Sequence, residues 1–582
     1  MEINEWEISL DFVGGDSIGS TISLMFSKAL LPFLFLPLLV RGADRPNVVL
    51  IICDDLNDYV ERLGGHPQAK TPNMKRLMDR GVSFTQAHCN IPICNPSRAS
   101  MVFGLYPHTS QLFGFEKWQT NAVFKNSRTF MDHFRANGYH TLGTGKIMHS
   151  GERKEWVEYG NDADYSPLAH RDGKNVAHPD VPSPFRDDFE SIDGSFGPLK
   201  KVKAPFSWKS GTWRKLEDFK YHSEEDRDLT ADEKNGQWAV ENLKSLAQSK
   251  KPFLMGVGFI RPHTPLIVPQ KYFDRFPLES IKLPVIKRGD VEDTFKRTVG
   301  SKEDDRSGDR GSKIYDQLIA SYGGDRELAL KKFIQAYLAS VASVDDLIGE
   351  ILDTIEESAL KENTIVILTS DHGWGMGEKD YLYKNSLWQE STRVPLVISA
   401  PGLTKPGTCG QPVSLIDLYP TLVDLCDLPK ETGKNAKGRP LDGHSLKPLL
   451  AKPDGGWTGP AAVLTAMYKW ADYYDPAEQN YALRDKEWRY IRYENGKEEL
   501  YHVAEDPHEW TNLALDSKHE ATLFSYRESL LKRIPKSIPK PEVTADEWKD
   551  RYFKRHPEAD TNKDGKLTWA EHKAHKKLKA KN

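Results

Sequence analysis

Short apolar runs separated by segments of helical periodicity constrain the fold of this chain more than any other feature. The first is Asn47–Cys53 (NVVLIIC), and further runs occupy residues 141–145, 253–259, 365–370 and 394–399. Between them lie amphipathic segments such as 328–355, whose apolar residues recur every three or four positions. Apolar strands that alternate with helices are typical of a parallel sheet covered on both faces. We therefore expect an α/β fold with a large mixed, mostly parallel sheet sandwiched by helices.

Reactive side chains follow four of these runs. In chain order they are Asp54 and Asp55, Lys146, His263, and Asp371 with His372. In an open parallel sheet, ligands bind outside the carboxyl ends of the strands. A single aspartate after a strand is usually a turn or helix-capping residue. Four such coincidences at one sheet edge favour a functional site over four unrelated turns.

Three of these side chains are carboxylates, which would repel each other at close range unless a cation neutralised them. Asp54, Asp55 and Asp371 supply hard oxygen ligands. Such ligands favour Ca²⁺ or Mg²⁺ over Zn²⁺. His372 is a less typical ligand for Ca²⁺. The pattern therefore predicts a site for a divalent cation at this edge.

Cys94 lies in the segment 94–98 (CNPSR), which is followed by the helix-compatible segment 99–103. Pro96 is suited to a first helical turn, so Cys94 is expected at or just before a helix N-terminus. Backbone N–H groups at that position favour an anion. On physical chemistry alone, Cys94 is either an activated thiolate or a structural buried cysteine.

The segment 94–98 resembles the signature of the sulfatase family, in which this cysteine is oxidised to formylglycine. The resemblance spans roughly residues 45–515 and includes the pair Asp54-Asp55 and the segments 145–149 (GKIMH), 261–265 (RPHTP) and 370–374 (SDHGW). His372, where many sulfatases have asparagine, and the two-residue gap between Lys146 and His149 are most similar to the iduronate-2-sulfatase branch of the type I sulfatases. The resemblance implies the fold of the alkaline phosphatase superfamily.

The same resemblance implies the hydrolysis of a sulfate ester. Formylglycine at position 94 would form a hydrate, and one of its hydroxyl groups would attack sulfur. The implied ligands of a catalytic Ca²⁺ are Asp54, Asp55, Asp371, His372 and the modified Cys94. A formylglycine-generating enzyme is the implied partner during maturation.

Five further side chains take roles from the resemblance. His263 is expected to protonate the leaving alcohol, and His149 to deprotonate the second hydroxyl so that sulfate is expelled. Arg98 and Lys146 are expected to orient the hydrate, while Lys384 in the segment 383–388 (YKNSLW) binds the sulfate group. Each cation taken alone is also compatible with a solvated surface residue.

The substrate implied by the resemblance is a sulfated saccharide, either a 2-O-sulfated uronic acid or a related polysaccharide unit. Aromatic side chains in the long polar stretches are candidates for stacking on sugar rings, although most such residues pack in cores. The candidates are Trp118, Trp208, Trp213 and Trp388.

Two other functions stay open. A phosphate or phosphonate ester hydrolase of the same superfamily generally uses a second metal, held by an aspartate with a histidine four positions later. The nearest candidate segment, 345–349 (DDLIG), has no such histidine. A catalytically dead carbohydrate-binding homologue is the other alternative, and the complete set of expected catalytic residues argues against it.

The first 43 residues are expected to form a leader. The apolar run 29–40 contains two prolines and is too short for a stable membrane span. Lys28 precedes it and residues 41–43 (RGA) follow it, which is typical of a signal peptide. The acidic residues before Met25 do not fit, so we expect translation to begin at Met25. The protein would then be secreted or periplasmic; an uncleaved anchor is the alternative.

Composition and the proline- and glycine-rich segments indicate how the chain is divided into domains. A net charge of −4 with 28% charged residues argues against nucleic-acid binding. We expect a catalytic domain at 44–455, a smaller C-terminal subdomain at 456–535, and a linker with a charged tail at 536–582. Short strands at 481–483, 488–493 and 499–502, followed by a helix from His519, predict that the subdomain is an antiparallel sheet with a helix.

Two polar, aperiodic stretches, 152–249 and 288–324, are interpreted as surface insertions around the mouth of the site. The cysteines other than Cys94 permit two disulfides without demonstrating any. These four are Cys53, Cys89, Cys409 and Cys426.

The tail contains a second calcium motif, DTNKDGKLTWAE at residues 560–571. The expected ligands are Asp560, Asn562, Asp564, the Lys566 carbonyl, Thr568 and Glu571. Gly565 would make the sharp turn of an EF-hand loop. The flanks 545–555 and 570–579 are compatible with helices. EF-hands normally pair, and no second loop is found, so weak binding or a chance match are the alternatives.

Overall fold

The computed structural model describes residues 45–212, 215–294, 309–468 and 475–536, together with 553, 556–565, 568, 571 and 574–575 of the tail. The described residues from Arg45 onwards belong to one compact unit. The leader expected at 1–43, including Met25, lies outside the described residues. In the described part of the chain, no helix is long and apolar enough to cross a membrane.

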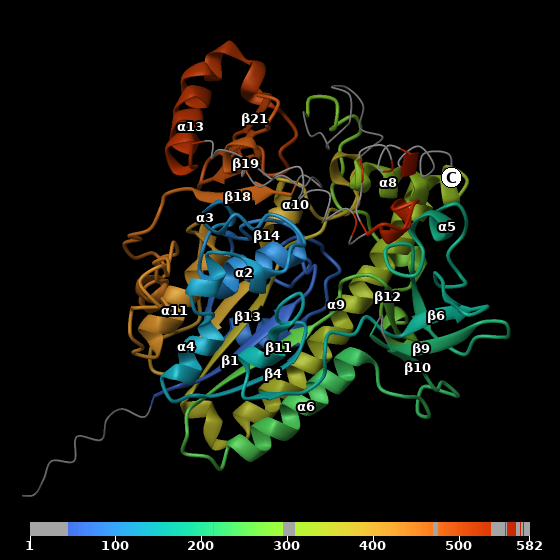
Figure 1. Cartoon of the computed structure of the whole chain (residues 1–582), viewed down its shortest axis with the longest axis horizontal. Coiled ribbons are helices and arrows are strands. Elements are labelled where there is room, and N and C mark those ends of the chain that lie inside the picture. The colour runs from blue at the N-terminus through green and yellow to red at the C-terminus, as the bar shows by residue number, and fades with distance from the viewer. Residues whose placement is uncertain are drawn as a thin grey trace, which may run out of the picture. The chain divides into compact units, whose positions relative to one another are not determined.

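The central feature is an eight-stranded sheet of order β16-β2-β15-β13-β1-β11-β4-β5 (Figure 1). Its middle strand, β1 (Asn47–Cys53), pairs in parallel with β11 (Phe253–Phe259) and β13 (Thr364–Ser370). β4 (His140–Gly145) continues the parallel pairing on the far side of β11. Four of the five predicted strands are thus confirmed as neighbours, and their carboxyl ends share one edge.

The fifth predicted strand, at 394–399, is divided in the structure. Pro395 separates β14 (Arg393–Val394) from β15 (Leu396–Ser399) because proline lacks the N–H that a continuous ladder needs. β15 runs antiparallel to β13, which makes the sheet mixed. β14 instead joins a three-stranded sheet with β3 (Ala87–His88) and β17 (Val413–Ser414). The outer strands of the large sheet are β2 (Val82–Phe84), β16 (Gly407–Cys409) and β5 (Glu158–Tyr159).

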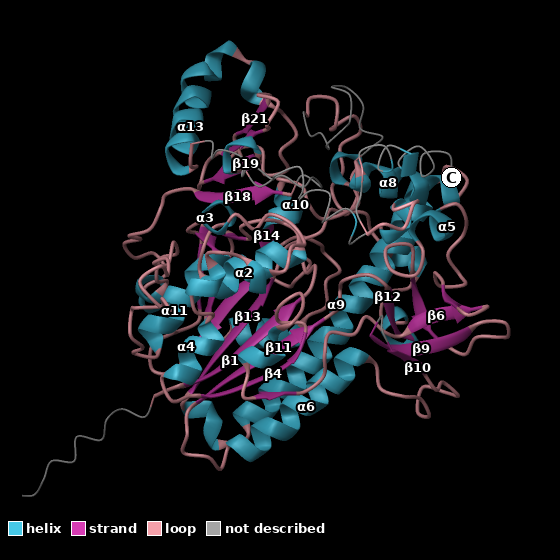
Figure 2. Ribbon diagram, in the orientation of Figure 1, coloured by secondary structure: helices cyan, strands magenta, loops and turns pink. Residues whose placement is uncertain are grey.

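Helices cover both faces of the sheet, as Figure 2 shows. Alternate residues of a strand point to opposite faces. Val49 and Ile51 accordingly belong to one core, with α6 (Ala231–Leu246) and α9 (Arg326–Glu356). Val48 and Leu50 belong to the other core. The helices of that second core are α2 (Cys94–Phe103), α4 (Phe130–Ala136) and α11 (Leu418–Leu425).

The stretch 152–249 differs from its interpretation as a surface insertion. Its last part is α6, which packs Ala239 and Leu243 into a core. A capping box of Thr230 and Glu233 starts this helix, and it is the sequence signal that could have identified it. Earlier residues form a small antiparallel sheet of order β10-β9-β6-β7. Its strands are β6 (Leu168–Arg171), β7 (Lys174–Asn175), β9 (Ser207–Thr212) and β10 (Lys215–Asp218).

The C-terminal part is an antiparallel sheet with one packed helix, as expected. Its strands are β18 (Val463–Met467), β19 (Asn480–Arg484), β20 (Arg489–Arg492) and β21 (Glu498–Tyr501). The sequence analysis did not predict β18, because this short strand is buried along its whole length and its sequence shows no alternation of polar and apolar residues. Leu523 and Leu530 of α13 (Glu520–Arg533) pack against this sheet.

Short elements complete the described chain. The helices are α1 (Pro72–Met78), α3 (Pro107–Ser110), α5 (Phe185–Phe189), α7 (Gln270–Phe273), α8 (Arg310–Ser321), α10 (Gln389–Thr392) and α12 (Lys447–Ala451). β8 (Phe196–Leu199) pairs with β12 (Leu266–Pro269). All five cysteines are buried and free, so neither of the two disulfides that the composition permits is present.

Candidate active site

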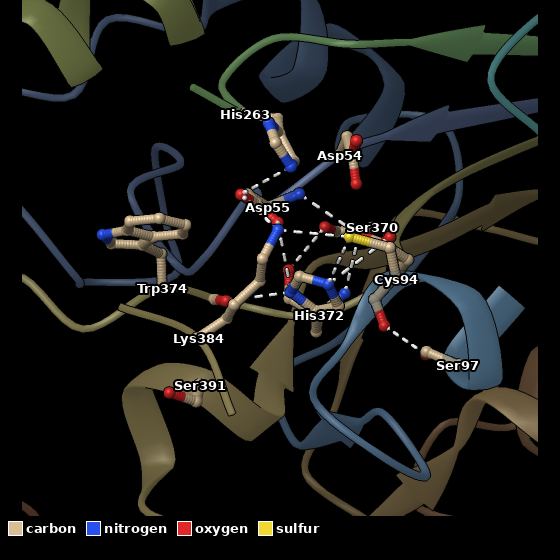
Figure 3. Close-up of polar contacts among 12 residues, drawn as sticks. Asp54, Asp55, Cys94, Ser97, His263, Ser370, His372, Trp374, Lys384 and Ser391 are labelled. Carbon is tan, nitrogen blue, oxygen red and sulfur yellow. Dashed lines mark hydrogen bonds and ion pairs between the residues drawn. The ribbon is translucent and has the colours of Figure 1, made fainter. Parts of the chain in front are cut away.

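The predicted reactive residues meet at the carboxyl edge of the central strands, as Figure 3 shows for most of them. Asp54 and Asp55 follow β1, while Asp371 and His372 follow β13; all four are fully buried. Cys94 is the first residue of α2, and it is 3% exposed. The predicted convergence of these side chains is therefore present in the structure.

Cys94 contacts two cation-capable groups. Its Sγ lies 3.1 Å from Lys384 Nζ and 3.4 Å from His372 Nε2. Burial raises the pKa of the Cys94 thiol, and Lys146 and Lys384 only partly offset this. At this position desolvation of the charged form outweighs the two lysines, so burial favours the neutral thiol.

The carboxylates and histidines form two overlapping groups around Cys94. Ligand atoms of Asp54, Cys94, Asp371 and His372 all lie within 4.8 Å of one another. A second group contains Asp55, Cys94 and His263. His372 joins the two groups, since its Nδ1 is 3.3 Å from Asp55 Oδ1 and its Nε2 is 3.6 Å from Asp371 Oδ2.

The backbone of Asp55 is strained in a way that aims its side chain into the site. Its φ of 64° lies in the left-handed region, which is uncommon for a residue other than glycine. Two bonds hold it there. Its N–H donates to Asp371 Oδ1 at 3.1 Å, and its carbonyl accepts from Tyr337 Oη at 2.7 Å. Strain of this kind persists only where surrounding contacts determine it.

Arg98 and Lys146 neutralise one side of the cluster. Arg98 Nε donates to Asp371 Oδ2 at 2.8 Å, and its Nη2 lies 3.2 Å from Asp54 Oδ1. Lys146 Nζ donates to Asp54 Oδ2. Burial alone would raise the pKa of Asp54, but Lys146 and Arg98 outweigh it and hold the pKa well below its usual range.

Lys384 neutralises the other side. Its Nζ donates to Asp55 Oδ1 at 2.9 Å and to Oδ2 at 3.1 Å. Burial nevertheless holds the pKa of Asp55 well above its usual range, because Lys384 and His372 offset only part of the desolvation. The pKa values of the two neighbouring aspartates thus depart in opposite directions from the usual value. The surrounding cations outweigh burial at Asp54 but not at Asp55.

The residues present fit a hard divalent cation. Asp54 Oδ1 is buried and accepts no hydrogen bond from the described residues, although Arg98 Nη2 lies nearby. A buried carboxylate oxygen without a hydrogen bond is costly unless another charge satisfies it. The oxygens of Asp54, Asp55 and Asp371, with the imidazole of His372, form a donor set that suits Ca²⁺ or Mg²⁺.

Two histidines flank this cluster. His263 Nε2 lies 3.8 Å from Asp55 Oδ2, and burial and then Lys384 hold its pKa well below the usual value. His149 is half-buried beside the Phe115 ring, at 5.2 Å between ring centroids. Burial and then Lys146 lower the pKa of His149 to about 3. Burial thus disfavours the charged form of both imidazoles.

Two residues of the site were given no role by the sequence analysis. Tyr165 lies 5.1 Å from the His263 ring, and Lys146 Nζ is 5.0 Å from the Tyr165 ring centroid. Ser97 Oγ donates to the Asp371 carbonyl at 2.6 Å and so ties α2 to the end of β13. Tyr165 had no signal beyond the aromatic content of its stretch, whereas Ser97 belongs to the recognised motif.

The tryptophans that were candidates for sugar stacking are core residues where they are described. Trp118, Trp208 and Trp388 are 6%, 3% and 2% exposed and pack in three different cores. Trp213 lies outside the described residues.

The EF-hand-like tail is only partly described, and Lys566 is outside the described residues. Asp560 Oδ2 accepts the Gly565 N–H at 2.9 Å, and Glu571 Oε2 accepts the Thr568 N–H at 2.9 Å. These carboxylates therefore bond to the backbone of their own loop. Calcium binding by Asp560, Asn562, Asp564, Lys566, Thr568 and Glu571 stays a prediction.

Comparison with known proteins assigns the family. The Sulfatase family model matches residues 46–428, and the model for the C-terminal region of N-sulphoglucosamine sulphohydrolase matches 377–536. A sulfatase of Formosa agariphila is 32% identical over 87% of this chain and 89% of its own length. Iduronate 2-sulfatase of Mus musculus is 26% identical over 84% of this chain and 94% of its own.

Solved structures agree on the fold. A protein in complex with its substrate D-glucosamine-2-N,6-O-disulfate superposes with a TM-score of 0.61 at 19% identity, covering 84% of this chain and 98% of that one. The phosphonate monoester hydrolase of Agrobacterium radiobacter gives 0.59 at 21% identity, covering 84% and 95%. The chain belongs to the sulfatase family, within the type I sulfatases of the alkaline phosphatase superfamily, and is a sulfuric ester hydrolase.

Proposed function

We propose that this enzyme removes sulfate from a sulfated saccharide, a 2-O-sulfated uronic acid or a related polysaccharide unit, using formylglycine made from Cys94 and a bound Ca²⁺. The observation that carries the proposal is the placement of Cys94 at the centre of a buried cluster of carboxylates, lysines and histidines. Two similar proteins are named as iduronate 2-sulfatase and as a 2-O glycosaminoglycan sulfatase. These names support a saccharide substrate.

Conversion of Cys94 explains why an unactivated cysteine occupies the centre of the site. Burial raises the pKa of its thiol, so the unmodified residue is a weak nucleophile. Formylglycine supplies an oxygen nucleophile through its hydrate, and the second hydroxyl of that hydrate provides a way to release sulfate. A formylglycine-generating enzyme would carry out the conversion.

Asp54, Asp55, Asp371 and His372 would hold the Ca²⁺ together with position 94. The ion, when bound, supplies Lewis-acid stabilisation of charge on oxygen. Arg98 keeps two of these ligands in place, since it contacts Asp371 and Asp54 while donating to the Ile147 carbonyl at 3.1 Å. Because Arg98 is fully buried behind the carboxylates, its role is to orient them and position 94.

Lys384 would bind the sulfate group. Its Nζ lies 3.1 Å from Cys94 Sγ, so it is close to the position where the nucleophilic oxygen would meet that group. Lys146 contributes charge from the opposite side through Asp54. Preorganised cations of this kind stabilise charge that develops in the transition state.

The two histidines would move the protons. His263 would protonate a departing alcohol, because it lies at the rim of the cluster, 3.8 Å from Asp55, and Asp54 favours its charged form. His149, a neutral imidazole, is suited to accept the proton of the second hydroxyl. The two side chains come from different loops, one after β4 and one after β11, so each can serve one half of the reaction.

Cys94→Ala tests the proposal most directly. Free sulfate would be measured after incubation with a panel of sulfated saccharides, alongside phosphate and phosphonate esters. Wild-type protein is expected to release sulfate, Cys94→Ala to release none, and the matched variant Cys426→Ala, which changes another buried free thiol, to keep its activity. Hydrolysis of phosphate or phosphonate esters alone would contradict the proposal, and so would an unmodified Cys94 in mass spectra of protein from its native host.

The phosphate or phosphonate hydrolase alternative would need a second metal site. Asp345, in the segment considered for it, instead caps α1: its carboxylate accepts the N–H groups of Met74 at 2.8 Å and Asn73 at 3.0 Å. A capping carboxylate is already satisfied and is a poor metal ligand. The alternative of a dead carbohydrate-binding homologue predicts ligand binding without turnover, which the same sulfate assay distinguishes.

The remaining sequence expectations are part of this proposal. They are a cleaved leader at 1–43 with a secreted or periplasmic location, a catalytic domain at 44–455 with a C-terminal subdomain at 456–535, and one EF-hand-like Ca²⁺ site at 560–571 in the tail 536–582. N-terminal sequencing of protein from its native host tests the leader, and a product that begins before residue 44 would contradict cleavage there.

A further inference from the structure

We propose that Phe115 and Tyr468 form a sugar-binding platform at the rim of the active site, here called the Phe115–Tyr468 platform. The face of one ring would stack against the apolar face of a saccharide ring, and the other ring, at 79° to the first, would border the edge of the sugar, while the sulfate group reaches the Cys94 cluster. The inference rests on the proposed function and deepens it, because it names the residues that distinguish a ring-bearing substrate from a small sulfate ester.

The platform consists of two aromatic rings beside a residue of the site. The Phe115 ring is 5.2 Å from the His149 ring and 5.9 Å from the Tyr468 ring, with interplanar angles of 65° and 79°. Phe115 is 44% exposed, whereas Trp118, Trp208 and Trp388 are buried. A single exposed apolar side chain is common on protein surfaces, but this one lies beside a second aromatic ring and a histidine of the site, and aromatic side chains next to polar groups are typical of ligand sites.

Asn95 fixes the Phe115 side of the platform. This residue follows Cys94 directly and is buried. Its Nδ2 donates to the Gly114 carbonyl at 2.6 Å and to the Glu116 carbonyl at 3.0 Å, the two residues that flank Phe115. The position of the Phe115 backbone is therefore set by the residue beside the proposed nucleophile.

Asn385 fixes the Tyr468 side in the same manner. It follows Lys384 directly, its Nδ2 donates to the Tyr468 carbonyl at 2.9 Å, and its Oδ1 accepts the Tyr468 N–H at 3.1 Å. Its φ of 65° lies in the left-handed region, which asparagine tolerates better than most residues. The N–H of Asn385 donates to the Pro92 carbonyl at 2.8 Å, just before α2.

The two halves are held together at close range. A Cβ added to Gly114 would lie 2.6 Å from Tyr468 Cε2, so a larger residue at position 114 would displace the Tyr468 ring. The backbone beside each ring is thus held by the residue that directly follows Cys94 or Lys384. The Sγ of Cys94 and the Nζ of Lys384 are themselves 3.1 Å apart. A ring stacked on the platform would therefore sit at a defined distance from the point where sulfate reacts.

A saccharide fits this surface on chemical grounds. A pyranose ring has an apolar C–H face for the aromatic rings and polar edges for the groups around them. Glu116, whose Oε2 accepts the Gly114 N–H at 3.1 Å, lies beside Phe115 and offers a carboxylate acceptor for sugar hydroxyls. Ligand sites that combine an apolar wall with a few fixed polar groups give both affinity and orientation.

Phe115→Ala and Tyr468→Ala test the platform by comparing two substrates, a sulfated disaccharide and ethyl sulfate, which has no ring. For the disaccharide, KM is expected to rise roughly tenfold with kcat within about twofold, because uniform binding is lost. For ethyl sulfate, neither constant is expected to change by more than about twofold. Phe524→Ala, which removes a phenylalanine of similar exposure from α13, is the matched control and should change neither substrate.

Binding to an inactive protein separates this inference from the proposed function. In the Cys94→Ala background, calorimetry should show that Phe115→Ala weakens disaccharide binding by roughly tenfold. That result without any wild-type sulfate release would overturn the proposed function but keep the platform. Sulfate release from the disaccharide that is unaffected by Phe115→Ala and Tyr468→Ala would overturn the platform. An equal rise in KM for ethyl sulfate, or for choline sulfate, would show that the two rings do not recognise a sugar.

Discussion

Two buried ionic clusters in this molecule are organised differently. The first is the Cys94 cluster of the active site. The second, here called the Glu509 cluster, contains Arg489, Glu509, Lys379 and Asp290 and joins the C-terminal sheet to the loop before α10. In the Glu509 cluster Arg489 Nε donates to Glu509 Oε1, and Lys379 Nζ donates to Asp290 Oδ1 at 3.2 Å. Each acid there has a cation of its own.

The Cys94 cluster instead shares its charges. Asp54 contacts both Lys146 and Arg98, and Lys384 is shared between Asp55 and Cys94. Asp54 Oδ1 also lacks a hydrogen bond from the described residues. The Glu509 cluster also has a buried atom without a hydrogen bond from the described residues, Arg489 Nη2, so an unsatisfied atom alone does not separate the two clusters. In the Cys94 cluster, however, Arg98 and Lys384 are shared between groups, and the unsatisfied atom is a carboxylate oxygen, which a cation can bind.

Lys384→Met should produce the largest effect. The substitution removes the cation nearest to Cys94 and leaves Asp55 without its closest partner, so kcat/KM for sulfate release should fall by about 10²–10³-fold. The measurement is sulfate release at matched concentrations of folded protein. Lys313→Met, on the surface of α8, serves as the control and should keep wild-type activity. A loss below about threefold in Lys384→Met would mean that Lys384 does not act on the reacting group.

Arg489→Met should give the reverse pattern. Removing one partner of a buried pair leaves Glu509 uncompensated, and the free energy of unfolding should fall by about 3–5 kcal/mol. Denaturant unfolding monitors the stability, and sulfate release per folded molecule should stay near the wild-type value. If this variant loses turnover while keeping its stability, the Glu509 cluster belongs to the catalytic machinery and the comparison fails.

Of the two ionic clusters, only the Cys94 cluster should respond to the removal of divalent cations. The carboxylates of Asp54, Asp55 and Asp371 repel one another without a bound ion, so Ca²⁺ at a hundred times its Kd should add about 2.7 kcal/mol to the free energy of unfolding. Thermal unfolding after chelation and after Ca²⁺ addition measures this. Asp371→Asn should reduce the increment, whereas Arg489→Met should show the same increment as wild type. An increment that persists in full in Asp371→Asn would place the ion elsewhere.

The pH dependence of stability should reveal a smaller effect near the Glu509 cluster. Burial raises the pKa of Glu378 to about 7, with Asp58 and Asp290 also acting in that direction. A carboxyl group with a raised folded pKa stabilises the protein fully below its unfolded pKa of 4.5, and this contribution is lost as pH rises towards 7. Glu378→Gln should therefore be more stable than wild type at pH 8, by roughly 1 kcal/mol, and equal to it at pH 4.5. The unfolding midpoints of the two proteins at pH 8 and pH 4.5 measure this difference. A Glu378→Gln variant that is less stable than wild type at pH 8 would contradict the raised pKa of Glu378.

Much of the active site was predictable because strand ends impose proximity. Asp54, Lys146 and Asp371 are far apart in sequence, but each follows a strand of the same sheet, and sheet geometry brings them together. Lys384 lies in a loop, and only the resemblance to sulfatases marked it. Its contact with Asp55 spans 329 positions and has no local pattern.

The platform residues were not predictable for a related reason. Phe115 and Trp388 are both aromatic residues in polar surroundings, yet one is exposed at the site and the other is 2% exposed in a core. Their difference depends on which side chains cover them after folding, and no periodicity reports that. Similarly, α6 was missed because its polar residues hide a narrow apolar face, although its capping box was present in the sequence.

The burial of Cys94 has a consequence for how active molecules arise. Cys94 is 3% exposed, and every residue of α2 is buried. Under the proposed function, an enzyme that oxidises Cys94 would have to reach the segment 94–98 as extended chain, before α2 packs into the core. Folding and oxidation would then compete in time, and a molecule that folded first would stay inactive. The fraction of active enzyme would be set during synthesis, by the ratio of two rates.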